Sequence, residues 1–128
     1  MLFILLRGPA GSGKSIVSIS LKNKIQNEKS INSYLLKLDE INKNVFENYM
    51  MKALDYECII GEMFHGNEHT TQPETWISRF KEKNSNIFSF ILKATRETCL
   101  ERCINDNNKE IVSQNREKEQ FSISFTIL

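Results

Sequence analysis

A glycine-rich run near the start of the chain holds the residues best suited to chemistry. It consists of Gly8, Pro9, Ala10, Gly11, Ser12, Gly13, Lys14 and Ser15. The run matches the pattern G-x-x-x-x-G-K-[ST] at every fixed position, and the apolar segment 2–6 before it is typical of a buried strand. The pattern predicts a phosphate-binding loop between a strand and a helix.

Such a loop can bind a polyphosphate through several kinds of group. Glycines let backbone N–H groups approach the phosphates, the Lys14 ammonium supplies a cation, and the Ser15 hydroxyl can bind Mg²⁺. The helix that begins here adds its unpaired N–H groups and the positive end of its dipole. A plain turn between strand and helix is the alternative, but the position of the run between these two elements favours nucleotide binding.

Two carboxylates are expected at the same edge of a sheet as this loop. Asp39 follows the strand-like segment 33–38, and Glu62 ends the strand-like segment 57–62. Ligands of parallel α/β sheets bind at the carboxyl ends of the strands, where both residues would lie. Asp39 is the candidate for orienting or deprotonating an acceptor hydroxyl, with helix capping as the alternative. Glu62 is the candidate for holding Mg²⁺, directly or through water, with a solvated strand end as the alternative.

Strand-like and helix-like segments alternate along the rest of the chain. The expected strands cover residues 2–6, 33–38, 57–62 and 86–92, and the expected helices cover residues 14–27, 42–55, a segment after the capping-box sequence 71–74 that carries a buried Trp76, and a segment capped by Thr95. This alternation predicts a three-layer α/β fold, in which a parallel sheet of four to five strands has helices on both faces.

The last residues, 121–128, alternate apolar and polar side chains, which predicts a fifth strand at the edge of the sheet. No helix follows in the sequence to cover that edge. We therefore expect either a partner that covers the edge strand or a truncated chain.

Composition indicates one small domain spanning residues 1–128. The chain has 17 Lys and Arg against 16 Asp and Glu, so its net charge of +1 provides no overall field that would attract nucleic acid or anionic membrane. Its three cysteines, Cys58, Cys99 and Cys103, lie within apolar patterns and indicate reduced thiols, the last two facing the core. No apolar run is long enough for a signal peptide or a membrane span, so we expect a cytoplasmic protein without membrane contact.

The loop, Asp39, Glu62 and the segment 95–104 with its Leu100-Glu101-Arg102 together resemble the small P-loop kinases of the polynucleotide kinase and zeta-toxin-like group, over roughly residues 1–106. The resemblance implies a P-loop kinase-like fold with a five-stranded parallel sheet, ATP with Mg²⁺ as cofactor, and transfer of the terminal phosphoryl group to a hydroxyl. By this resemblance, Lys14 and Ser15 match the phosphate and metal contacts, Asp39 matches the acceptor-side carboxylate, and Glu62 stands where the group usually has Asp.

The acceptor is not fixed by this pattern. A polynucleotide 5′-end, a nucleoside, a sugar acid and an amino-sugar are all compatible with it, because loops and lid determine acceptor choice. The loop 64–70 leaves the same edge of the sheet, and it is interpreted as a substrate-side loop in preference to a metal site, with His65 and Glu68 as candidate contacts.

The expected lid, about residues 105–120, departs from the pattern of that group. Lid arginines neutralise the charge that develops on the transferred phosphoryl group. Arg102 is the candidate for this role, but Asp106 stands where a second arginine is expected, and Arg116 is the candidate substitute. The alternative to a kinase is therefore a nucleotide-binding module or a slow ATPase without efficient kinase activity.

Overall fold

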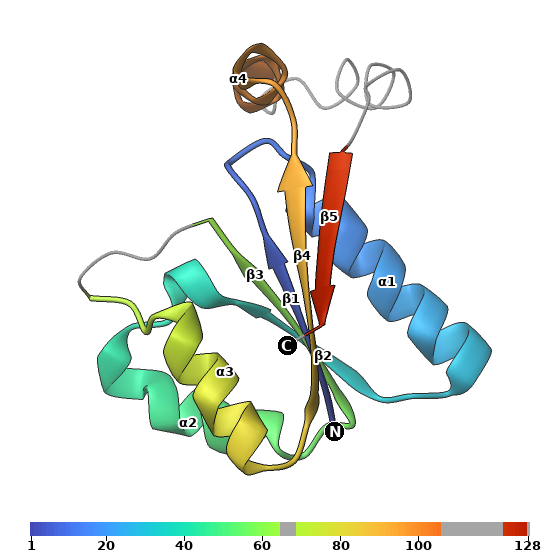
Figure 1. The fold of residues 1–128 in the computed structure, drawn as a ribbon, viewed down its shortest axis with the longest axis vertical. Helices are drawn as coiled ribbons and strands as arrows, with labels where there is room; N and C mark the ends of the chain where they lie inside the picture. The colour runs from blue at the N-terminus through green and yellow to red at the C-terminus, as the bar shows by residue number, and fades with distance from the viewer. Residues whose placement is uncertain (65–68, 106–121, 128) are drawn as a thin grey trace.

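The computed structural model describes residues 1–64, 69–105 and 122–127. Its elements are β1 (Leu2–Arg7), α1 (Lys14–Lys29), β2 (Ser33–Lys37), the 3₁₀ turns η1 (Leu38–Glu40) and η2 (Lys43–Val45), α2 (Phe46–Ala53), β3 (Cys58–Met63), α3 (Pro73–Glu82), β4 (Asn86–Lys93), α4 (Arg96–Asn105) and β5 (Ser122–Ile127). The strands and helices expected from the hydrophobic pattern are all present, with ends shifted by a few residues (Figure 1).

The strand that leads into the glycine-rich run, β1, lies in the middle of the sheet. The strand order of the described sheet is β2-β3-β1-β4-β5. Strand β1 pairs in parallel with both β3 and β4, and β2 pairs in parallel with β3. The predicted four parallel strands are confirmed, and their carboxyl ends share one edge, where the loop lies.

The fifth strand lies at the edge of the sheet, as predicted, but it runs antiparallel to β4. Phe88 pairs with Ile127 at one end of this ladder, and Lys93 pairs with Ser122 at the other. The implied five-stranded parallel sheet is therefore wrong for β5. A parallel neighbour needs a crossover to the amino end of β4. Figure 1 instead shows α4 beyond the carboxyl end of β4, and β5 begins beside that same end.

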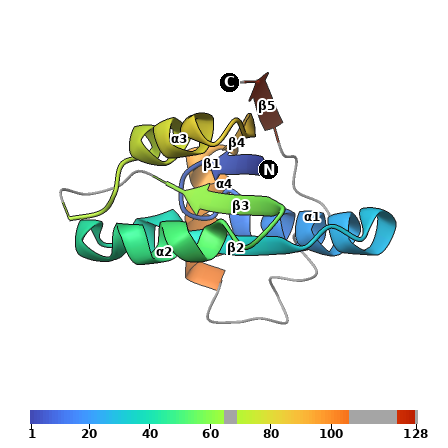
Figure 2. The same cartoon turned by 90° about the horizontal axis from the view of Figure 1, so that it is seen from below.

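Helices cover both faces of the sheet, which gives the predicted three layers (Figures 1 and 2). On one face, α1 packs the apolar stripe that its sequence predicts, namely Val17, Leu21 and Ile25. On the other face, α2 and α3 pack around Trp76, which is fully buried as predicted. The rings of Phe3 on β1 and Phe80 on α3 stack with their centroids 4.4 Å apart. This aromatic packing fixes the strand that precedes the loop.

The predicted capping box at the start of α3 is wrong by one residue. Gln72 occupies the N-cap position and Pro73 opens the helix. The hydroxyl of Thr71 is buried and has no hydrogen-bond partner among the described residues. Among the described helices, none has both the length and the apolar character that a membrane crossing requires.

Helix α4 differs from its sequence pattern in the face that it buries. Its cap is as predicted, because the backbone N–H of Thr98 donates to Oγ1 of Thr95 at 3.1 Å. Cys99 is buried, but Cys103 is exposed, so the prediction that both face the core is wrong for Cys103. The reason is the position of α4 beyond the sheet, where one side of the helix contacts the loop and no sheet face covers the rest (Figure 1).

Candidate functional site

The glycine-rich run joins β1 to α1, and its Lys14 side chain bonds back to the first residues of the run. Lys14 Nζ donates hydrogen bonds to the carbonyl oxygens of Gly8 at 2.6 Å and Pro9 at 3.0 Å. An ammonium group has three donor hydrogens, so these two bonds leave one for a phosphate oxygen. Lys14 therefore shapes the loop and can also contact a ligand inside it.

The outer side of the loop lies directly against α4. Gly11 has a φ of +82°, and a Cβ on this residue would lie 2.5 Å from the carbonyl oxygen of Cys99. Glycine is required here both for the backbone angle and for this close approach. Arg102 is only 3% exposed, and its Nη1 donates to the Gly11 carbonyl oxygen at 2.7 Å. The structure thus brings the candidate Arg102 to the main chain of the loop.

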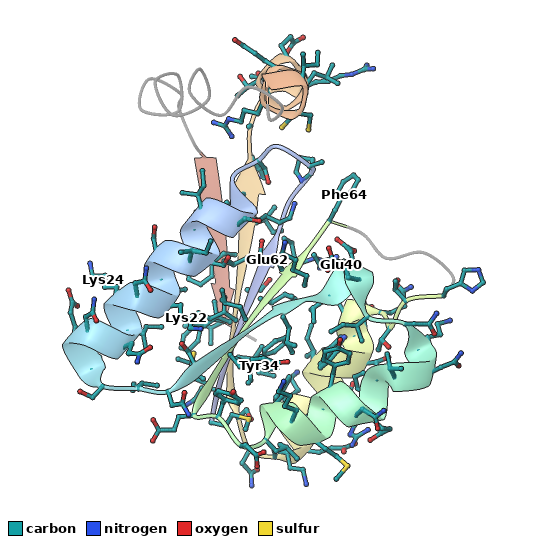
Figure 3. All side chains as sticks on the ribbon, turned by 180° about the vertical axis from the view of Figure 1, so that it is seen from behind. Lys22, Lys24, Tyr34, Glu40, Glu62 and Phe64 are labelled. Atoms are coloured by element: carbon teal, nitrogen blue, oxygen red, sulfur yellow. The ribbon has the colours of Figure 1, made fainter. Side chains whose placement is uncertain are left out.

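Glu62 lies beside the start of α1, as Figure 3 shows, and both of its carboxylate oxygens accept hydrogen bonds from that helix. Ser15 Oγ donates to Oε1 at 2.9 Å, and Ser18 Oγ donates to Oε2 at 2.9 Å. Strand β3 continues past Glu62 to Met63, and Glu62 is only 7% exposed. The alternative of a solvated strand end is therefore wrong, and the predicted pair Ser15 and Glu62 is in direct contact.

This pair fits a magnesium ion that is shared with a polyphosphate. The described residues contain no group of three or more His, Cys, Asp or Glu side chains that could hold a metal by itself. Mg²⁺ usually keeps several waters and takes one or two protein oxygens together with substrate phosphates. The Ser15 hydroxyl and the Glu62 carboxylate would supply the protein oxygens, directly or through water.

Asp39 lies in η1, immediately after β2, and is tied to the end of β3. The backbone N–H of Phe64 donates to Asp39 Oδ2 at 2.6 Å. The other oxygen, Oδ1, is buried and has no hydrogen-bond partner among the described residues. The helix-capping alternative for Asp39 is wrong, because Asn42 accepts the capping bond of the next turn, from Asn44 N at 2.9 Å.

Electrostatics link the three charged candidates into one cluster. Burial lowers the pKa of the Lys14 ammonium, and the carboxylates of Asp39 and then Glu62 oppose that shift by attraction. Both carboxylates are thus near enough to Lys14 to affect its charge. A polyphosphate in the loop would add negative charge to the same ammonium and favour its protonated form.

Ser18 belongs to this site, although no motif in the sequence marks it as a site residue. A serine inside an amphipathic helix is typical of the solvent side, whereas Ser18 is fully buried against Glu62. The signal that could have identified it is its position three residues after Ser15, because residues at this spacing share one face of a helix.

Arg96 is a second residue that no motif in the sequence marks. It is exposed at the first position of α4, and with Pro9 and Ala10 it lines a pocket of about 390 Å³ over the loop. An arginine in the first turn after β4 could have been identified once the position of α4 over the loop was known.

The remaining candidates, His65, Glu68 and Arg116, lie outside the described residues, as does nearly all of the predicted lid.

Comparison of the chain with models of known protein families finds no match, and comparison with curated proteins finds no match either. What the chain does must therefore be inferred from the loop and from the carboxylates around it.

Proposed function

We propose that the chain is an ATP-dependent phosphotransferase that moves the terminal phosphoryl group of ATP to a hydroxyl acceptor. The observation that carries this proposal is the contact of Ser15 with Glu62 at 2.9 Å, at the mouth of a loop whose lysine keeps a donor for a phosphate. Asp39 adds a carboxylate oxygen without a hydrogen-bond partner among the described residues at the same edge of the sheet.

In this proposal each residue has one task. The backbone N–H groups of the loop and the Lys14 ammonium hold the phosphates and stabilise the charge that develops on them. Ser15 and Glu62 hold Mg²⁺, which when bound neutralises part of the phosphate charge. Asp39 orients the acceptor hydroxyl and accepts its proton.

The transfer itself exchanges one bond to phosphorus for another. The acceptor oxygen forms a bond to the terminal phosphorus of ATP, and the bond from that phosphorus to the bridging oxygen breaks, so that ADP leaves. The hydroxyl proton passes to the Asp39 carboxylate, which later releases it to water. The products are ADP and the phosphate monoester of the acceptor.

A nucleotide-binding module or slow ATPase is the second candidate function, and one contact favours it. Arg102 donates to the main chain of the loop at 2.7 Å, which occupies part of the guanidinium expected to stabilise the transferred phosphoryl group.

For the phosphotransferase, we propose that the exposed Arg96, which lines a pocket with Pro9 and Ala10, stabilises the transferred phosphoryl group in place of Arg102.

The test combines calorimetry with ATP and Mg²⁺ and a labelled-phosphate screen over hydroxyl acceptors, including single-stranded oligonucleotides. Lys14→Ala is expected to weaken ATP binding and to abolish transfer, because it removes the ammonium from the loop. Lys24→Ala is the matched control, since Lys24 projects from the outer side of α1 (Figure 3). Unchanged turnover in Lys14→Ala would refute the proposal. ATP binding by the wild type without transfer to any acceptor would favour the second candidate.

A further inference from the structure

A pocket of about 390 Å³ lies along β2, the edge strand of the sheet, next to the phosphate loop. Residues of α1, β2, η1, α2 and β3 form its walls, and the wall nearest the loop includes Ser15 and Glu62. A molecule in this pocket would therefore touch the two residues proposed to hold the metal. The pocket is thus placed to bring an acceptor to the terminal phosphoryl group.

The charges around the pocket argue against an anionic occupant. Among the described wall residues, Lys37 is the one cation, whereas Glu40 and Glu62 both contribute carboxylates. Figure 3 shows Glu40 on the segment after β2, across from Glu62 on β3. Phosphate and carboxylate ligands are usually held by arginines, by several cations or by clustered N–H groups. Among the described wall residues, a sugar acid or an acceptor that carries its own phosphate would meet one lysine and two carboxylates.

The remaining walls suit a flat, largely apolar ring. Ile19 and Tyr49 present exposed side chains to the pocket from α1 and α2. Tyr34 forms a fixed wall, because its ring stacks on Tyr56 at 4.8 Å and Lys52 Nζ lies 5.2 Å from its centroid. Aromatic rings of this kind pack well against heterocycles.

The backbone of β2 adds polar groups to this apolar surface. In the described sheet, β2 has a neighbouring strand on one side, so its outer N–H and C=O groups are not used in a ladder. Such groups can pair with the donors and acceptors at the edge of a heterocycle. The pocket volume also lies in the range of about 300–1,000 Å³ that is typical of small-molecule sites.

We infer that this pocket binds the phosphoryl acceptor, and that the acceptor is an uncharged molecule of nucleoside size. Its heterocycle lies against β2 and Tyr49, and its hydroxyl points toward Ser15 and Glu62. Asp39 is not a wall residue of the pocket, but it directly precedes the wall residue Glu40 in the chain. This inference rests on the proposed function and narrows its acceptor from a general hydroxyl compound to a nucleoside.

A matched pair of ligands tests the charge argument. Adenosine and cytidine are compared by calorimetry, without ATP, with their 3′-monophosphates, which keep the base and the 5′-hydroxyl but add a phosphate. The nucleosides are expected to bind at least about tenfold more tightly than the 3′-monophosphates. Glu40→Lys is expected to narrow this ratio, because it replaces a carboxylate by a cation at the pocket wall. Tighter binding of the 3′-monophosphates by the wild type would overturn the inference.

Surface substitutions test the location of the pocket without disturbing the core. Ile19 is 53% exposed and Tyr49 is 37% exposed, so Ile19→Trp, which fills the pocket, and Tyr49→Ala, which removes the ring, are expected to leave the fold intact. Each should weaken nucleoside binding about tenfold or more. Met51→Ala is the control on α2, because Met51 is 69% exposed and is not a wall residue. Unchanged binding in both pocket variants would overturn the inference.

The outcomes also separate this inference from the proposed function. If ATP binds and Lys14→Ala abolishes that binding, but no nucleoside binds, then the inference fails and the phosphate loop stands. If nucleosides bind and ATP does not, then the pocket stands and the phosphotransferase proposal fails. Phosphorylation of glucosamine in preference to adenosine would also overturn the inference, because it would assign the acidic wall to an amino-sugar.

Discussion

Ser18 and Glu62 are 44 residues apart in the sequence, yet the Ser18 hydroxyl donates to Glu62 Oε2 at 2.9 Å inside the protein. Ser15 holds the other carboxylate oxygen from one turn earlier on α1. A glutamate has one methylene more than an aspartate, which lets its carboxylate reach both hydroxyls. The two serines therefore fix the orientation of the carboxylate that we propose for the metal site.

Ser18→Ala is expected to raise the Mg²⁺ concentration needed for half-maximal ATP binding by about tenfold, because a carboxylate held on one side alone is less well oriented. ATP affinity without Mg²⁺ should not change, which separates this effect from a general loss of structure. Ser18→Thr keeps the hydroxyl, so its half-maximal Mg²⁺ concentration should be that of the wild type. Ser20→Ala, on the exposed side of α1, is the control. An unaltered Mg²⁺ titration in Ser18→Ala would contradict the role of Ser18.

Asp39→Asn is expected to reduce phosphoryl transfer by about 10²-fold or more while ATP binds as before, because the amide cannot take up the acceptor proton. The substitution keeps an oxygen that can accept the hydrogen bond from Phe64 N, so the end of β3 should stay in place. Single-turnover transfer and ATP calorimetry are measured on the same preparation. Asp55→Asn, on the protein surface, is the control. Transfer at the wild-type rate would leave Asp39 with a structural role alone.

The two arginines of α4 are expected to have different roles, one in stability and one in phosphoryl transfer. Arg102→Ala removes a charged hydrogen bond to the loop and should lower the free energy of unfolding by about 1.5–3 kcal/mol, measured with urea. Arg96→Ala changes an exposed residue, so stability should stay constant while transfer falls about 10²-fold. Equal stability of Arg102→Ala and wild type, or full transfer by Arg96→Ala, would show that the roles are assigned wrongly.

Cys58 should make stability depend on pH in the alkaline range. Burial raises the pKa of its thiol to about 11 from an ordinary value of 9.0, so the unfolded chain loses this proton at lower pH than the folded protein does. The stability that comes from the neutral thiol is complete below about pH 9 and is lost as pH rises toward about 11.

Cys58→Ala removes this titration and serves as the comparison. It should lower stability by a constant amount, because it leaves a small cavity, and it should reduce the fall between about pH 9 and about pH 11 by about 2–3 kcal/mol. Urea unfolding across this range measures both curves. Parallel curves for the two proteins would show that the thiol does not titrate as expected.

The sequence predicts the parts of the fold that depend on local pattern. The stripe Val17, Leu21 and Ile25 predicts α1 and the face that it buries, and the short apolar runs predict the four parallel strands. The site follows from the same logic, because Asp39 and Glu62 come at the ends of strands that share an edge with the loop. Spacing along the chain is enough for such inferences when the connections are regular crossovers.

The parts that the sequence does not predict depend on where whole elements lie. The direction of β5 follows from the position of α4 beyond the sheet, which no alternation of side chains encodes. The burial of Ser18 requires Glu62 from a distant strand, and the exposure of Cys103 follows from the lack of a sheet face behind α4. Each of these features needs a contact between segments that are far apart in the sequence.

The two strands that lead into the proposed site differ in their number of neighbouring strands. Strand β1, which leads into the glycine-rich loop, is flanked by partners on both sides, whereas β2, which leads into Asp39 and the proposed acceptor pocket, has one partner in the described sheet. Substitutions at the margin disturb fewer hydrogen-bonded neighbours than substitutions at the centre. A library randomised along β2 and η1 should therefore yield variants with altered acceptor preference and unchanged ATP affinity. This edge of the sheet is thus the natural place to redesign specificity.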